Sequence, residues 1–494
     1  MLGNKKVQRK SMATNGMFSF AAKLAAMIVP FVVYPFVMRV LGAESYGKVA
    51  YAESLVSYFT LFSLLGIESY AQRECSVARD NTSMLCKVSS RVFALNLIMT
   101  SISLVIYLSI VFLVPGMQNE RPLYLVFALW IVGGGLSMNW LYMAQERFDL
   151  IAIREIVAKV LYLILCFTLI KSNDSYLIFG VIVVFTGTMF TMLWNFCGIL
   201  KGECGIIPNL RCSQGFTECL KPIFFLALLT IGSKLFTDFD VLMIKWFTTT
   251  ESDKAVGLYN SAILLPKALD AILMTVSAVI TPQLFIATRK ADEPKVLELM
   301  NKTSNALFLI AIPAVITCFF FSREMLWVFA GEEYIVASPV LQIYSFIIMG
   351  VLSITLAGTR TYIARQKERK LFKILIIGAA LNIVLNFLFI KMWGITGAAL
   401  ATLVAYAVVM SIELTFEKTW HYIFTKDKLK YMISGVAVVI VFYVVKTFFS
   451  FHPAITLSIG IIVAGLLYVT ILYFMKESTI EQVICRLKLI IRKK

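Results

Sequence analysis

The sequence predicts an all-α membrane protein with about fourteen transmembrane helices, and three observations support this prediction. Stretches of roughly 20 apolar residues, the length that an α-helix needs to cross the hydrocarbon core, recur from Met17 to Met475. Hydrophobic residues make up 59% of the 494 residues and charged ones 15%, and the mean hydropathy is +0.83. The connectors between the apolar stretches are short and charged. A water-soluble protein of this length would need far more polar surface.

Fourteen apolar segments account for the predicted helices. They lie near 14–39, 47–72, 89–114, 122–145, 151–171, 175–200, 219–247, 256–288, 303–322, 338–364, 371–391, 395–420, 429–449 and 453–475. The eighth is long and contains Pro266, which predicts a bend because proline removes a backbone donor from the helix. In the fourth, Gly133-Gly134-Gly135 lies in mid-span. There it indicates close helix packing or a hinge rather than a phosphate loop.

Basic residues are distributed unevenly between the two sides of the predicted membrane. The two tails and the even-numbered connectors hold most of them, whereas each odd-numbered connector holds few. Because cytoplasmic loops carry an excess of Lys and Arg, both termini are predicted to lie in the cytoplasm, and an even helix count agrees. The net charge of +17 then reflects topology and contact with anionic lipid, not binding of nucleic acid.

A short repeat divides the chain into two halves. Tyr142-Met143-Ala144 recurs 220 residues later as Tyr362-Ile363-Ala364. Six predicted helices separate the copies, and an even number indicates parallel repeats related by an axis along the membrane normal. The expected organisation is a cytoplasmic tail at 1–13, an N-lobe of six helices at 14–200, a cytoplasmic connector at 201–218, a C-lobe of six helices at 219–420, two helices at 429–475 and a cytoplasmic amphipathic tail at 477–494.

Charged side chains within the predicted spans are the main functional signal, because each costs about 2.5–3.5 kcal/mol at a helix centre. Helical spacing puts Lys234 on one face with Asp238, and it puts Lys267 on one face with Asn260 and Asp270. Two interpretations stay open: a buried ion-pair network that holds helices together, or a cationic lumen for an anionic substrate. The charged residues that we single out are Lys23, Glu53, Lys159, Lys234, Asp238, Asp240, Lys267, Asp270 and Arg360.

A second set of residues is polar but uncharged. Asn382 and Asn386 lie four residues apart in one predicted span, and Thr402 lies in the next. Together with Asp238 or Asp240 they would offer oxygen ligands to a monovalent cation. Hydrogen bonding between helices is the alternative, and the residues alone favour it.

The sequence contains no recognisable catalytic constellation. His421 and His452 are the two histidines and are isolated, and the nine cysteines lack the spacing of a metal site. There is no G-x-x-x-x-G-K-[ST] motif for ATP. We therefore expect a protein that is not an enzyme and that has no metal or cofactor.

Several motifs resemble one transporter superfamily. They are Tyr34-Pro35, Arg39-Val40-Leu41-Gly42, Tyr46-Gly47, Gly66-Ile67, Tyr70-Ala71-Gln72-Arg73-Glu74 and the pair Gly257 and Tyr259. With these motifs, the plan of six, six and two helices resembles the MOP superfamily. The opening is most similar to the O-antigen and capsule repeat-unit flippases of the Wzx type.

The resemblance implies a multi-pass protein of the bacterial cytoplasmic membrane. Such a flippase moves undecaprenyl-pyrophosphate-linked oligosaccharide from the inner to the outer leaflet by alternating access. The oligosaccharide serves the biosynthesis of a surface polysaccharide, such as lipopolysaccharide or capsule. Membrane lipids and polysaccharide polymerase machinery are the expected partners.

The resemblance also implies roles for individual residues. In such flippases lumenal cations meet the pyrophosphate or acidic sugars, and Lys23, Lys234 and Lys267 match that role by depth. The expected substrate-binding set also contains Arg360, Glu53, Asp270 and Asn260. Lipid II flippases of the superfamily have a sodium site, whose positions are matched here by Asp238 or Asp240, Asn382, Asn386 and Thr402. Asn386 replaces an aspartate of that site, so one negative charge is missing, and coupling to Na⁺, H⁺ or the membrane potential stays open.

Two other functions remain as alternatives. A cation-coupled multidrug exporter of the same superfamily needs an acid-rich lumen. Lys23 has no acidic residue within one helical turn, which favours an anionic substrate instead. An enzyme acting on the same lipid-linked sugar needs a catalytic constellation or a sizeable outer loop, and no outer connector is long enough to fold into a domain.

Overall fold

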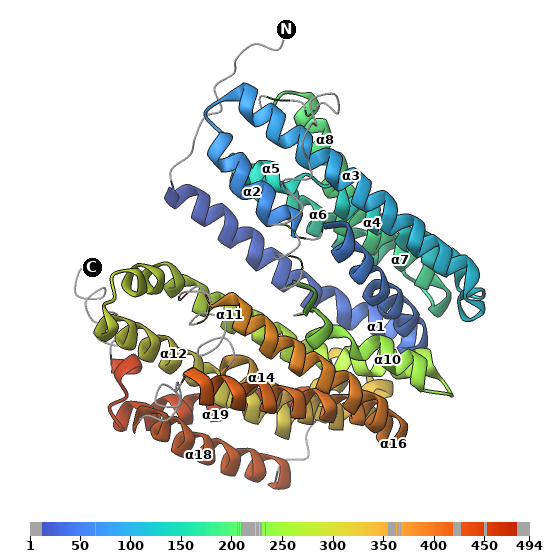
Figure 1. Cartoon of the computed structure of the whole chain (residues 1–494). Coiled ribbons are helices and arrows are strands. Elements are labelled where there is room, and N and C mark those ends of the chain that lie inside the picture. Colours follow the sequence, from blue (N-terminus) through green and yellow to red (C-terminus); the bar gives the residue numbers. More distant parts are fainter. Residues whose placement is uncertain are drawn as a thin grey trace. The chain divides into compact units, whose positions relative to one another are not determined.

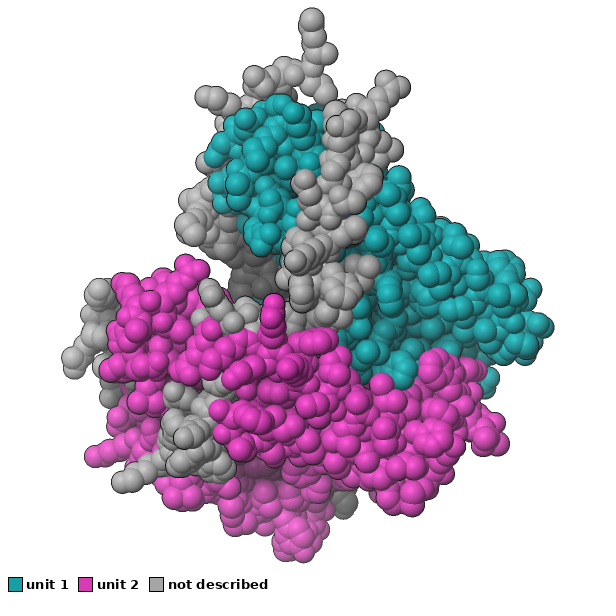
Figure 2. Space-filling view, viewed as in Figure 1, with its two compact units in different colours: residues 1–242 teal, residues 243–494 magenta. Residues whose placement is uncertain are grey.

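The computed structural model describes residues 12–481, apart from 65, 205, 207, 209–222, 224–226, 228–229, 233, 354–361, 363–364, 366, 418–425 and 449–451. Within this part of the chain every regular element is a helix, as Figure 1 shows. The predicted all-α fold is confirmed. The described chain forms two compact units, residues 1–242 (unit 1) and 243–494 (unit 2), which Figure 2 colours separately. The lobe boundaries expected from the sequence stay a prediction.

Unit 1 is built from helices that follow one another with short connections. They are α1 (Met12–Leu64), α2 (Ile67–Ala78), α3 (Thr82–Leu113), η1 (Pro115–Met117), α4 (Arg121–Gly135), α5 (Asn139–Ala144), α6 (Phe148–Leu169), η2 (Asn173–Ser175), α7 (Tyr176–Val184), the π-helical turn η3 (Phe185–Met189) and α8 (Phe190–Leu200). Residues 234–238 are also helical, and α10 (Asp240–Phe247) crosses the boundary between the units. α1 packs against α3, α4 and α6.

Unit 2 contains the remaining helices. They are α11 (Ser252–Arg289), α12 (Glu293–Phe320), α13 (Ser322–Phe329), η5 (Glu332–Ala337), α14 (Ser338–Ser353), α16 (Glu368–Glu417), α18 (Lys426–Phe448) and α19 (Pro453–Phe474). α12 packs against α11, α14 and α18, and α14 packs against α16. α18 and α19 lie side by side (Figure 1). The bend expected at Pro266 in α11 stays a prediction.

Two glycines break helices that otherwise run on. Gly42 interrupts α1 with φ 73° and ψ 171°, and Gly394 interrupts α16 with φ 57° and ψ −133°. Positive φ is costly for residues with a Cβ atom and open to glycine. Each of these long elements is therefore two helices joined at a glycine. They correspond to the predicted pairs 14–39 with 47–72 and 371–391 with 395–420.

The described helices suit a bilayer. Ten of them are long and apolar enough to cross a membrane, and two of these ten contain the breaks at Gly42 and Gly394. Large apolar side chains such as Val105, Leu466 and Phe448 are exposed, which is unfavourable in water and normal against lipid tails. The chain is thus a multi-pass membrane protein. The count of fourteen stays a prediction, because part of the segment expected at 219–247 lies outside the described residues.

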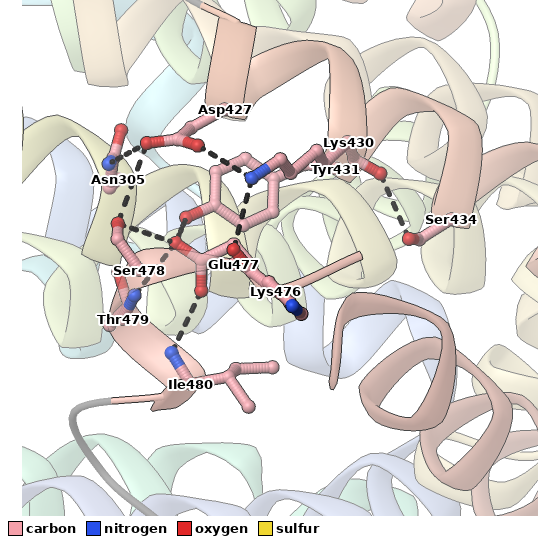
Figure 3. A network of polar contacts seen from close by, with 10 residues as sticks. All are labelled: Asn305, Asp427, Lys430, Tyr431, Ser434, Lys476, Glu477, Ser478, Thr479 and Ile480. Atoms are coloured by element: carbon pink, nitrogen blue, oxygen red, sulfur yellow. Dashed lines mark hydrogen bonds and ion pairs between the residues drawn. The ribbon is translucent and has the colours of Figure 1, made fainter. Parts of the chain in front are cut away.

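A polar network joins α12, α18 and the segment after α19 in unit 2 (Figure 3). The Tyr431 hydroxyl donates to Glu477 Oε1 at 2.6 Å. The backbone N–H groups of Thr479 and Ile480 donate to the same carboxylate at 2.9 and 2.8 Å. On the α12 side, Asp427 accepts from Asn305 at 3.4 Å. Glu477 therefore accepts hydrogen bonds at the start of the last described helical turn and connects this turn to α18.

Candidate functional site

Unit 1 contains a polar cluster at membrane depth, which we define as Glu53, Tyr58, Lys159, Lys234 and Asp238. Its centre is the ion pair that helical spacing predicts: Lys234 Nζ donates to Asp238 Oδ2 at 2.7 Å. The two side chains are 29% and 26% exposed. At such partial burial a close pair neutralises both charges without removing them from reach of a ligand.

An aromatic side chain of α1 covers the ion pair. The Tyr58 ring centroid lies 5.8 Å from Lys234 Nζ, within the range of a cation–π interaction. The Tyr58 hydroxyl also donates to the Lys234 backbone carbonyl at 3.5 Å. The Phe239 ring packs edge-on to Tyr58, with centroids 5.9 Å apart. Tyr58 thus joins α1 to the helical segment that carries Lys234.

A second lysine belongs to the cluster. The Glu53 carboxylate of α1 interacts electrostatically with both Lys234 and Lys159. Lys159 comes from α6, and its ammonium lies 5.8 Å from the centroid of the Tyr162 ring. The cluster therefore gathers two lysines and two carboxylates from three segments, and their charges balance. An anionic group that enters can replace a carboxylate as the partner of a lysine.

The other predicted substrate-binding residues lie in unit 2 or outside the described part. Lys267 and Asp270 are half-buried on α11 and interact electrostatically. Asp270 Oδ1 is buried without a hydrogen-bond partner among the described residues. Asn260 is half-buried on the same helix. The Lys23 side chain and the whole of Arg360 lie outside the described residues, so all these assignments stay predictions.

Three of the predicted cation ligands form one hydrogen-bonded chain inside unit 2. Asn382, Asn386 and Thr402 are each 0% exposed. Asn386 Nδ2 donates to Asn382 Oδ1 at 2.7 Å, and Asn382 Nδ2 donates to Thr402 Oγ1 at 3.1 Å. The Thr402 hydroxyl donates to the Ala398 carbonyl at 3.0 Å. This is the bonding between helices that the residues favoured over a cation site.

The remaining two predicted cation ligands belong to unit 1. Asp238 is held by Lys234, as described above, and Asp240 is buried at the start of α10. The described residues include no group of three or more His, Cys, Asp and Glu that could hold a metal ion. The chain of amides and hydroxyls in unit 2 carries no negative charge. These three side chains would offer a monovalent cation neutral oxygens.

A buried arginine, which the sequence analysis did not single out, organises the end of unit 1 around α5. Arg154 of α6 is 2% exposed. Its Nη1 donates to Asn195 Oδ1 at 2.6 Å and its Nη2 to Asn139 Oδ1 at 3.0 Å. Arg154 lies inside the predicted span 151–171, so a charge within an apolar segment was the signal that could have found it.

The Arg154 contacts stabilise a break in the membrane-crossing segment that α4 and α5 form. α4 ends at Gly135, and Met138 has a φ of 52°. The carbonyl of Gly135 accepts from Asn96 Nδ2 at 2.5 Å, and that of Ser137 accepts from Asn195 Nδ2 at 2.6 Å. Backbone carbonyls freed inside a membrane need donors from the protein. Two asparagines supply them, and Arg154 orients one of the two.

Close packing at the three glycines before the break is confirmed. A Cβ atom on Gly133 would lie 2.9 Å from the backbone nitrogen of Met189, and one on Gly135 would lie 2.2 Å from Thr100 Oγ1. Glycine at these positions lets α4 approach α3 and η3 more closely than any other residue allows.

The chain is similar to known proteins at the level of family and sequence. Residues 12–288 match the family model described as "Polysaccharide biosynthesis protein". A protein of Escherichia coli K12 named "Putative O-antigen transporter" is 21% identical over 393 residues, which cover 79% of this chain and 92% of that protein. A protein of Haloferax volcanii named "Probable low-salt glycan biosynthesis flippase Agl15" is 26% identical over 253 residues, covering 49% and 51%.

Solved structures show the same fold. The lipid II flippase MurJ in an inward closed conformation superimposes with a TM-score of 0.75 at 18% identity, covering 93% of this chain and 99% of that chain. A multidrug resistance MATE family transporter of the MOP superfamily, in an inward-facing conformation, has a TM-score of 0.58 at 12% identity, covering 81% and 97%. At these low sequence identities the structural similarity establishes the fold. The match to the family rests on the sequence of residues 12–288.

Proposed function

This chain belongs to the polysaccharide biosynthesis protein family and is a polysaccharide flippase of the MOP superfamily, and we propose that its substrate is an oligosaccharide linked to undecaprenyl pyrophosphate. Like its relatives, it is a transporter and not an enzyme. The proposal places it in the bacterial cytoplasmic membrane with both termini in the cytoplasm, in contact with lipid and with polysaccharide polymerase machinery.

The observation that supports this substrate best is the polar cluster of unit 1. Lys159 and Lys234 offer two ammonium groups beside an aromatic side chain at membrane depth. Charges at that depth are expensive and usually mark a substrate path. Because Glu53 and Asp238 already neutralise the lysines, a pyrophosphate would take the place of these carboxylates rather than meet bare cations.

The physics of flipping agrees with this role. A sugar headgroup carries many hydroxyls, and each is costly to bury in hydrocarbon without a partner. A polar interior lowers that barrier while the lipid tail stays in the membrane. Moving two negative charges outward gains about 4–5 kcal/mol at 100 mV, inside negative. We therefore infer alternating access of the two units, with the membrane potential as one driving force.

The proposal is tested in proteoliposomes with a fluorescent polyprenyl-pyrophosphate oligosaccharide. We expect protein-dependent flipping that is faster with a membrane potential, and Lys234→Ala to slow it about ten-fold or more, equivalent to about 1.4 kcal/mol. Lys295→Ala is the matched control, since Lys295 forms an exposed ion pair with Glu298.

Two results would overturn the proposal. The first is wild-type flipping rates in a protein with alanine at Lys23, Lys234 and Lys267 together. The second is no flipping, accompanied by efflux of cationic dyes under a sodium or proton gradient, which would identify a multidrug exporter.

A further inference from the structure

Unit 2 buries a carboxyl group that the proposed function does not use. Glu413 lies four residues before the end of α16 at Glu417, and its side chain is 0% exposed. Neither Oε1 nor Oε2 has a hydrogen-bond partner in the part of the chain that the structure describes. Long charged side chains near helix ends normally reach water, and this one does not. Unpaired buried polar groups are rare in native proteins, so Glu413 requires an explanation.

Glu413 faces the interior of unit 2. Thr402, Tyr406 and Val409 precede it at spacings of four, three and four residues, which puts all four on one face of α16. All four are buried. α14 approaches this face, since a Cβ atom on Gly350 would lie 3.2 Å from Tyr406 Cβ. Along the helix axis, Glu413 is about 16 Å from Thr402, so it is separate from the asparagine and threonine chain.

Charged groups on the neighbouring elements do not compensate a carboxylate at this position. Burial separates Glu413 from water, and no charged group among the described residues offsets it. The titratable side chains on the elements packed here include Tyr344 of α14, Lys267, Asp270 and Arg289 of α11, and the exposed Lys370 and Lys373 of α16 itself. Among the described residues, an ionised Glu413 would therefore have no opposite charge to compensate it.

The surroundings of Glu413 indicate which cation its carboxyl group binds. Burying an ionised carboxylate without a partner costs far more than burying the neutral acid, so the group takes up a proton. Hard cations need several oxygen ligands, and the described residues around Glu413 include no group of three or more His, Cys, Asp and Glu that could hold a metal ion. A proton needs no second ligand.

We propose that Glu413 is a proton-binding site of unit 2. Its carboxyl holds a proton in this conformation and releases it to water when unit 2 rearranges and solvent reaches the group. The step is a reversible O–H dissociation that leaves the carboxylate on Glu413. Because a ligand favours the conformation that binds it better, proton binding is linked to the conformation of unit 2. That this linkage drives transport rests on the proposed function; the proton site itself does not.

The first test is infrared spectroscopy of the purified full-length protein in lipid. We expect a carbonyl-stretch band of a protonated carboxylic acid at neutral pH that shifts when glutamate is labelled with ¹³C. Glu413→Gln should remove this band, and Glu298→Gln, at an exposed glutamate of α12, should keep it. The absence of a glutamate-dependent band in the wild-type protein would overturn the proposal without any variant, as would a band that survives in Glu413→Gln.

The second test measures flipping in proteoliposomes under a pH gradient at zero membrane potential. We expect the wild-type rate to change several-fold with the gradient and Glu413→Gln to flip at one rate with or without it. Glu413→Asp, which keeps a buried acid, should restore the response. A Glu413→Gln protein that responds like the wild type would contradict the coupling. If no protein flips at all, the flippase function fails, and the infrared band still decides the proton site.

Discussion

At the scale of single residues, Arg154 shows how unit 1 holds a charge away from water. Its guanidinium is bonded to two neutral amides, Asn139 and Asn195, while the Glu155 carboxylate is farther away at 3.7 Å. Arginine suits this position because its planar fork donates in two directions at once. The charge has a structural role here, because Asn195 also donates to the Ser137 carbonyl at the α4–α5 break.

Replacing Arg154 by Met should destabilise the protein. The Oδ1 atoms of Asn139 and Asn195 would lose their donors, and each unsatisfied buried acceptor costs about 1–3 kcal/mol. We expect the melting temperature of the detergent-purified protein to fall by several degrees. Arg73→Met is the control, since Arg73 is 64% exposed and its ion pair is with its neighbour Glu74. Equal melting temperatures for the two variants would show that the Arg154 bonds do not stabilise the fold.

At the scale of elements, the break between α4 and α5 depends on the absence of a side chain. Gly135 allows Thr100 of α3 to lie where a Cβ atom would be. The same close approach lets Asn96, one turn before Thr100, reach the Gly135 carbonyl. The two contacts therefore form or fail together.

Gly135→Ala should lower the melting temperature, because the new methyl group overlaps Thr100 Oγ1 and pushes α3 from α4. Adding Thr100→Ala should recover most of the loss, since it removes both threonine atoms that the methyl meets. Gly465→Ala in α19 has open space around its Cβ position and should leave the melting temperature unchanged or slightly higher. A double variant no better than Gly135→Ala alone would mean that Thr100 is not the obstacle.

The network after α19 makes stability depend on pH. Burial alone would raise the pKa of Glu477, but hydrogen bonds from Tyr431 and from the N–H groups of Thr479 and Ile480 outweigh it and lower the pKa. The unfolded value is about 4.3. The resulting stabilisation is therefore fully present above that pH and is lost as the pH falls through the lower folded value.

Thermal unfolding at a series of pH values checks this. The wild-type protein should lose stability below about pH 4.3, and Glu477→Gln should be less stable at pH 7 and change less on acidification. Glu481→Gln, an exposed glutamate one turn later, should behave as the wild type. Parallel curves of melting temperature against pH for the wild type and Glu477→Gln would show that Glu477 does not cause the pH dependence.

At the scale of the whole molecule, the hydrogen-bonded chain of Asn382, Asn386 and Thr402 suggests a substitution that would create a cation site. Asn386→Asp replaces an amide by a carboxylate of nearly the same shape and adds the charge that the chain lacks. We expect this variant to gain stabilisation by Na⁺, seen as a melting temperature that rises with NaCl but not with choline chloride. The wild type should show no such difference. A flat response in the variant would show that charge is not what the chain lacks.

Much of the fold follows from patterns that a bilayer imposes on sequence. Apolar stretches of sufficient length predicted membrane-crossing helices, and fixed helical spacing predicted that Lys234 would meet Asp238. The same spacing puts Asn382 and Asn386 on one face of their helix, where they form a hydrogen bond. These predictions are local, since each depends on residues within one helix.

Such patterns could not predict contacts between segments that lie far apart in the sequence. Tyr58 lies 176 residues from Lys234 and meets it through tertiary packing alone. Arg154 escaped notice because hydropathy averages over a span and a single charge near its start changes the average little. The buried state of Glu413 was equally hidden, because the same residue in the same helix would be ordinary if it faced the solvent.

The 2.7 Å pair of Lys234 and Asp238 has a consequence for leakage. An unpaired ammonium inside a membrane would attract chloride or free phosphate whenever the carrier was empty, and such anions would dissipate the ionic gradients of the cell. A singly charged anion would have to break this bond in exchange for one of equal charge. A pyrophosphate brings several charges and many oxygens to the same place. For the pyrophosphate substrate proposed above, the resting ion pair would therefore favour polyvalent cargo over small anions.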